Sequence, residues 1–127
     1  MTKDPRLYLA HILECADRIE RYLGQDREAF LRNTTAQDAV IRNFEVIGGA
    51  AERILEQFRI VHAEIPWRLM AGFRDVLIHD YEGVDLEQVW GIAQEDLPAV
   101  KTAIACILPP LEQLEREITE ETDNLDA

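Results

Sequence analysis

Residues Val40–Phe58 read VIRNFEVIGGAAERILEQF, and their apolar side chains recur at every third or fourth position. Because an α-helix has about 3.6 residues per turn, this spacing gathers them along one helical face. Thr35 with Asp38 resembles a capping box, so we expect a single long helix from Thr35 to about His62. Its buried stripe is predicted to be Val40, Ile41, Phe44, Ile47, Ala51, Ile54, Leu55 and Phe58.

The middle of this helix contains the glycine pair Gly48 and Gly49. Each glycine costs roughly 1 kcal/mol relative to alanine in a helix interior, so the pair needs a structural reason. One interpretation is a close crossing with another helix of the same bundle. The other is a small surface that admits a second subunit or the backbone of a ligand.

Helical periodicity continues on the N-terminal side of this helix. Asp4 and Pro5 are typical of a helix start and Gly24 of a helix end, so the first helix is expected between them. A short helical piece, about 27–31, leads from there to Thr35.

Three more helices are expected after residue 65. Pro66 begins one, Asp85 caps another that runs to about Gln94, and Asp96 with Pro98 opens the last.

The C-terminal region should interrupt the last helix. Pro109-Pro110 is expected to kink or split it, and the acidic tail 120–127 is expected to fray. No strand-like alternation is present in the sequence. We therefore expect an all-α protein, an antiparallel bundle of four to five helices, with one domain at 1–119 and a tail at 120–127.

Composition narrows the classes of function. The 127-residue chain holds 25 acidic and 13 basic residues, and its net charge of −12 argues against broad binding to nucleic acid but leaves room for a local basic cleft. Strong acidity also suits docking to a basic protein partner. Cys15 and Cys106 stand singly in apolar patterns, so we expect two buried, reduced thiols. No membrane span or signal peptide is apparent, and we expect a cytoplasmic protein.

The stretch RDVLIHDY, residues 74–81, gathers polar groups that helix packing does not require. On a helix Arg74 and Tyr81 lie on nearly the same line, whereas His79 lies roughly 140° away from Arg74 and one turn beyond Asp75. We expect Asp75 to hydrogen-bond a ring nitrogen of His79. For Arg74 and His79 to cooperate, the helix must unwind near residue 78, or a second copy of the helix must complete the site in a symmetric dimer.

This Arg-x4-His-x-Tyr pattern suits cleavage of RNA. A histidine can take the proton of a ribose 2′-hydroxyl, and an arginine can neutralise the charge that develops on the phosphate. No acidic or histidine cluster stands at metal-ligand spacing, so we expect no metal and no cofactor. His11 and His62 are isolated and are expected to be surface or half-buried residues. The alternative is structural: Arg74 and His79 near a helix C-terminus can simply complement the helix dipole.

The segments PWRLMAGFRDVLIHDY, residues 66–81, and IRNFEVIG, residues 41–48, resemble HepT-like proteins of the HEPN superfamily. This resemblance implies a small HEPN-like helical homodimer whose two subunits share a cleft. It implies the toxin of a type II toxin–antitoxin system, a metal-independent ribonuclease acting on RNA such as tRNA or mRNA. It also implies a minimal nucleotidyltransferase antitoxin that transfers AMP groups to the motif tyrosine.

Carried over by position, the resemblance makes Arg74 and His79 the catalytic pair, Asp75 a supporting residue and Tyr81 the AMP acceptor. The chain departs from the family where it has Gly49, because family members often carry an acidic residue there; Glu45 and Glu52 are nearby carboxylates. A second hypothesis therefore stays open, in which the chain is a non-catalytic helical module that docks a nucleotidyltransferase or binds a nucleotide.

Overall fold

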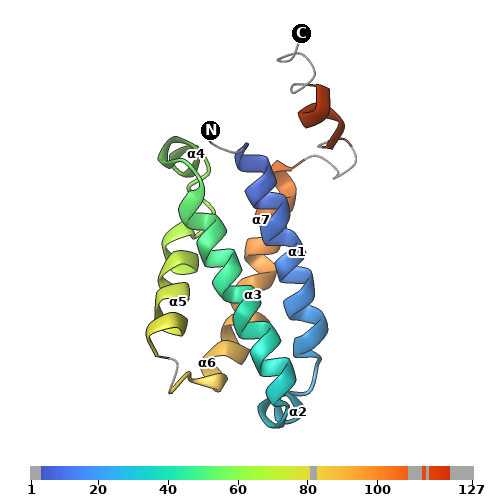
Figure 1. The fold of residues 1–127 in the computed structure, drawn as a ribbon, viewed down its shortest axis with the longest axis vertical. Coiled ribbons are helices and arrows are strands. Elements are labelled where there is room, and N and C mark those ends of the chain that lie inside the picture. Colours follow the sequence, from blue (N-terminus) through green and yellow to red (C-terminus); the bar gives the residue numbers. More distant parts are fainter. Residues whose placement is uncertain (1–3, 81–82, 109–112, 114, 121–127) are drawn as a thin grey trace.

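The computed structural model describes residues 4–80, 83–108, 113 and 115–120, and every regular element among them is helical. In Figure 1, α1, α3, α5 and α7 run side by side with alternating direction. The expectation of an all-α protein with antiparallel helices is confirmed for these residues. The elements are α1 (Pro5–Leu23), α2 (Arg27–Arg32), α3 (Thr34–Arg53), α4 (Glu56–Val61), α5 (Trp67–His79), α6 (Leu86–Gly91), the π-helix η1 (Ile92–Asp96) and α7 (Leu97–Ile107).

The first helix forms as its caps predict, but the start of α3 differs. Asp4 accepts a hydrogen bond from the backbone N–H of Arg6, and Gly24 ends α1 with a positive φ of 67°. Helix α3 is capped by Asn33, whose side chain accepts from the N–H of Ala36 at 3.1 Å. The expected Thr35 capping box is therefore wrong, because the asparagine two residues earlier already satisfies the free N–H groups of the first turn.

Helix α3 is also shorter than expected. It ends at Arg53, and Ile54 has an extended backbone (φ −76°, ψ 132°) before α4 begins at Glu56. Ile54 remains buried, whereas Leu55 is 51% exposed, so the predicted burial of Leu55 is wrong. The apolar spacing carries on across this break, and for that reason periodicity alone predicted one continuous helix.

The two helices expected after Asp85 form one helical run instead. Asp85 caps α6 as predicted, with its side chain accepting from two backbone N–H groups. Asp96 is itself helical (φ −86°, ψ −40°) and makes no side-chain cap, so the predicted restart there is wrong. A π-helical turn holds one residue more than an α-helical turn. Through this wider turn, η1, the helix continues into α7 without a break.

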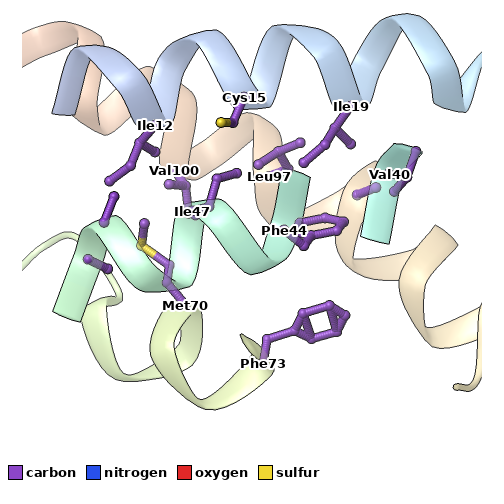
Figure 2. Packing of buried hydrophobic residues seen from close by; sticks show 14 of the residues in the cluster. Ile12, Cys15, Ile19, Val40, Phe44, Ile47, Met70, Phe73, Leu97 and Val100 are labelled. Carbon is purple, nitrogen blue, oxygen red and sulfur yellow. The ribbon is translucent and has the colours of Figure 1, made fainter. Parts of the chain in front are cut away.

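Helix α3 occupies the centre of the bundle, packed against α1 on one side and α5 on the other. Figure 2 shows the apolar side chains that fill the space between these helices and α7. Phe44 of α3 and Phe73 of α5 meet edge to face with ring centroids 5.1 Å apart. Lys101 of α7 pairs with Asp17 and Glu20 of α1 at 2.6 and 3.0 Å. This packing fixes α5, and with it the Arg-x4-His motif, against α3.

Three remaining expectations concern the surface and the chain termini. Both cysteines are free thiols, but Cys15 is buried and Cys106 exposed, so the expected burial is right only for Cys15. None of the described helices is long and apolar enough to cross a membrane. Pro109-Pro110 and residues 121–127 of the acidic tail lie outside the described residues.

Candidate functional site

The site is organised by a close crossing of α3 and α5 at Gly48. A Cβ atom built on Gly48 would lie 2.3 Å from the Cβ of Arg74 and 2.9 Å from the carbonyl oxygen of Met70. Side chains do not approach so closely, so only glycine permits this packing. The first interpretation of the glycine pair, a helix crossing within the bundle, therefore holds for Gly48. The crossing sets the root of the Arg74 side chain directly on α3.

The guanidinium of Arg74 is held by carboxylates from two helices. Its Nη1 lies 3.5 Å from Oε2 of Glu52 on α3 and 3.9 Å from Oδ1 of Asp75 on α5. The side chain is partly exposed, and a guanidinium has five N–H donors, so donors remain for a further anion. Of the two nearby carboxylates, Glu45 and Glu52, the second is thus the one that pairs with Arg74. Gly49 itself is next to the same group: a Cβ there would be in ordinary contact, 3.6 Å from Nε of Arg74.

His79 at the end of α5 is exposed, and its ring is oriented by the helix backbone. Nδ1 lies 2.8 Å from the backbone carbonyl oxygen of Asp75. The expected partner, the Asp75 carboxylate, is turned toward Arg74 instead, so that part of the prediction is wrong. Because a carbonyl oxygen only accepts hydrogen bonds, Nδ1 is the donor in this contact, which leaves Nε2 on the other side of the ring for a different partner.

Arg74 and His79 diverge on the helix, as their five-residue separation predicts. Helix α5 stays regular from Trp67 through His79, so the described structure does not show the unwinding near Ile78 that would bring them together. Arg74 and Ile78 line a groove with α1 and α3, whereas His79 is not among the residues of that groove. Tyr81, the third member of the motif, lies outside the described residues.

The groove beside Arg74 was not predicted from the sequence. It has a volume of about 590 Å³. We call it the basic groove and define it by Tyr8, His11, Arg42, Glu45, Arg53 and Arg74. The sequence does contain a trace of it, because positions 42, 46, 49 and 53 recur at three- and four-residue spacing and share one face of α3. His11, judged isolated in the sequence, joins this face only through the packing of α1.

The described part of the chain holds no candidate metal centre. No group of three or more His, Cys, Asp or Glu residues there is arranged to hold a metal ion.

Comparisons with known proteins agree on one family. A family model described as ribonuclease HepT-like matches residues 12–107. The chain is 42% identical over 102 residues to a protein of Thermococcus cleftensis named "Probable ribonuclease HepT", covering 80% of this chain and 93% of that protein. It is 38% identical over 107 residues to a "Putative RNase" of Caldanaerobacter subterraneus subsp. tengcongensis, covering 84% and 96%.

A longer relative matches over one part only. The chain is 40% identical over 114 residues to the "Gamma-glutamylcyclotransferase and putative RNase" of Methanocaldococcus jannaschii. The match covers 89% of this chain but only 51% of that protein, so the chain spans about half of its length. No solved structure matches the chain.

Proposed function

The chain belongs to the ribonuclease HepT-like family, and from this premise we propose that it is a metal-independent ribonuclease in which Arg74 and His79 carry the chemistry. Its substrate is single-stranded or looped RNA, with tRNA and mRNA as candidates. Its biological role is that of the toxin in a toxin–antitoxin pair.

The observation that carries the proposal is the state of the His79 ring. With Nδ1–H donated to the Asp75 carbonyl, Nε2 of this exposed side chain can accept the proton of a ribose 2′-hydroxyl. The 2′-oxygen then attacks the adjacent phosphorus, and the bond to the 5′-oxygen breaks. A protonated histidine returns a proton to that oxygen, which leaves a 2′,3′-cyclic phosphate and a 5′-hydroxyl. Arg74 stabilises the negative charge on the non-bridging oxygens.

A second subunit completes the site in this proposal. Arg74 and His79 diverge on a regular helix, so one chain does not bring both to a single phosphate. Two apolar side chains on one line of the same helix support a covering partner, because Leu69 and Val76 are 49% and 46% exposed. Exposed apolar side chains that flank a polar site are typical of a surface buried by association. A homodimer with two α5 helices facing each other would bury them and bring Arg and His from both chains together.

RNA cleavage in EDTA tests the catalytic assignment. We expect the purified chain to cut RNA, and Arg74→Ala and His79→Asn each to lower the rate by at least about a hundredfold. Arg74→Ala keeps the Cβ that packs on Gly48, and the Asn amide can still donate to the Asp75 carbonyl, so both variants should fold.

Arg32→Ala is the matched control for Arg74→Ala. Arg32 is exposed at the end of α2, outside both α5 and the basic groove, and its loss should leave the rate unchanged. Cleavage that survives in both Arg74→Ala and His79→Asn would overturn the assignment. Cleavage that appears only with added divalent metal would overturn the metal-independent mechanism.

Control of the enzyme is proposed to act through Tyr81. Tyr81 follows two residues after His79 in the sequence, past the end of α5, so an adenylate there would add bulk and negative charge near the proposed catalytic pair. We expect intact-mass spectra to show added adenylate when the chain is co-expressed with its nucleotidyltransferase antitoxin, and Tyr81→Phe to remove that mass. An unmodified chain whose toxicity is still neutralised would mean control by binding alone.

The alternative is a non-catalytic module that docks the nucleotidyltransferase or binds a nucleotide. Two observations favour it: the net charge of −12 and the Gly49 position, which lacks the acidic residue common in the family. Inducible expression in a bacterium separates the two functions. Growth arrest by the wild-type chain but not by His79→Asn supports the ribonuclease, whereas equal growth of both supports the module.

A further inference from the structure

The basic groove concentrates positive charge in an acidic protein. Arg42, Arg53 and Arg74 all line it, together with His11, and Glu45 is the one carboxylate among its lining residues in the described structure. The chain as a whole has 25 acidic and 13 basic residues. A groove lined with one sign of charge concentrates oppositely charged ligands even when the net charge of the protein repels them.

The arginines of the groove are available for a ligand. Arg42 pairs with Glu45 at 3.5 Å, and its side chain is 75% exposed. Within the described residues no carboxylate lies within 4 Å of Arg53, which is in the last turn of α3. Arg74 shares Glu52 and Asp75 but is still partly open to the groove. None of the three is locked in a buried ion pair, so each can turn to a phosphate.

The shape of the groove fits nucleic acid rather than a single ion. Arg42 and Arg53 are eleven residues apart, which separates them by about 16 Å along α3, with Gly49 between them opposite Arg74. The half-buried ring of Tyr8 on α1 offers an aromatic surface for a base. The volume of about 590 Å³ is that of a pocket for a nucleotide-sized ligand.

We propose that the basic groove is an RNA-binding subsite that holds the strand next to the cleaved phosphate. This inference rests on the proposed ribonuclease function and adds residues outside the Arg-x4-His-x-Tyr motif. Arg42 and Arg53 bind phosphates on either side of Arg74, and Tyr8 stacks on a base. The RNA strand therefore runs along α3. Arg74 belongs both to this subsite and to the proposed catalytic pair on α5, and so connects the two.

Binding of a 2′-O-methyl RNA oligonucleotide, which cannot be cleaved through the 2′-oxygen, tests the subsite directly. Fluorescence anisotropy in EDTA at several salt concentrations gives both the Kd and its salt dependence. We expect Arg53→Ala to raise the Kd several-fold, and Arg42→Ala with Arg53→Ala to raise it at least tenfold. The slope of log affinity against log salt should fall by about 0.7 for each arginine removed.

Arg32→Ala is the matched control for Arg53→Ala. Both arginines are exposed in the last turn of a helix, so each substitution removes a favourable interaction between a cation and the helix dipole. Arg32 is not in the groove, and its removal should leave the Kd and slope unchanged. Arg53→Gln, which keeps most of the side-chain volume without the charge, repeats the test if truncation unfolds the protein.

The outcomes separate this proposal from the ribonuclease proposal. Groove variants that bind RNA with the wild-type Kd and slope, or a control that weakens binding equally, would overturn the subsite. The subsite would also be overturned if the groove variants changed subunit association, measured by sedimentation, but left RNA binding unaltered. The groove would then be a subunit contact. A wild-type chain that binds RNA through the groove but never cleaves it would uphold the subsite and overturn the ribonuclease.

Discussion

At the scale of single residues, the adjacent glycines Gly48 and Gly49 have different surroundings. Gly48 is buried against the Arg74 Cβ and the Met70 carbonyl, two atoms that cannot move without moving α5. Gly49 faces the basic groove, where the nearest atom is the Nε of a flexible arginine. The helix crossing therefore requires one glycine of the pair and not the other.

Substitution of each glycine by alanine tests this difference. We expect Gly48→Ala to destabilise the protein by about 1–3 kcal/mol, because the clash outweighs the gain in helix propensity. We expect Gly49→Ala to stabilise it by up to about 1 kcal/mol, because the added methyl group makes only ordinary contact. Urea unfolding followed by circular dichroism measures both changes. Two variants of equal stability would contradict the close crossing.

The contact of His79 with Asp75 was predicted only in part. Helical geometry predicted that its ring would interact with Asp75, one turn earlier. It did not distinguish the carboxylate from the backbone carbonyl, because both lie within reach of the ring. In the structure the ring contacts the carbonyl, and the Asp75 carboxylate lies 3.9 Å from the guanidinium of Arg74. The catalytic roles of Arg74 and His79 stay predictions until cleavage is measured.

At the scale of elements, the apolar spacing predicted which segments are helical better than where they end. The break at Ile54 and Leu55 has no glycine or proline to mark it, and the spacing continues through it. Its consequence is visible on α4, where Ile60 and Val61 are 67% and 73% exposed. If α3 and α4 formed one continuous helix, the side chains of Ile60 and Val61 would point in other directions. The break thus creates an apolar surface beside α5 that the sequence pattern does not reveal.

At the scale of the whole molecule, the bundle shows how an acidic chain can have a local basic surface for the proposed RNA substrate. Packing of α1 and α5 on either side of α3 brings arginines from α3 and α5 to one groove, while the excess acidic residues lie elsewhere. The arrangement of these helices is seen in Figure 1. A net charge of −12 therefore does not exclude nucleic acid, as the possibility of a local basic cleft already allowed.

The shared cleft of the proposed dimer leads to a complementation experiment. Subunits carrying Arg74→Ala and His79→Asn are co-expressed with different tags and the mixed dimer is purified through both. We expect each parent dimer to be inactive and the mixed dimer to recover RNA cleavage, because one chain supplies the arginine and the other the histidine. A mixed dimer as inactive as its parents would contradict a site built from both chains.

The sequence by itself determined the helical class, most of the caps, the apolar faces and the divergence of Arg74 from His79. These features depend on spacing along one helix, and the helical repeat is a local property of the chain. Only the tertiary structure decided that Gly48 packs against Arg74 and that Arg74 pairs with Glu52. It also decided that His11 lines the same groove as Arg42 and Arg53. Those contacts join helices far apart in the sequence, and they depend on how whole faces pack at a crossing. No periodicity within a single helix contains that information.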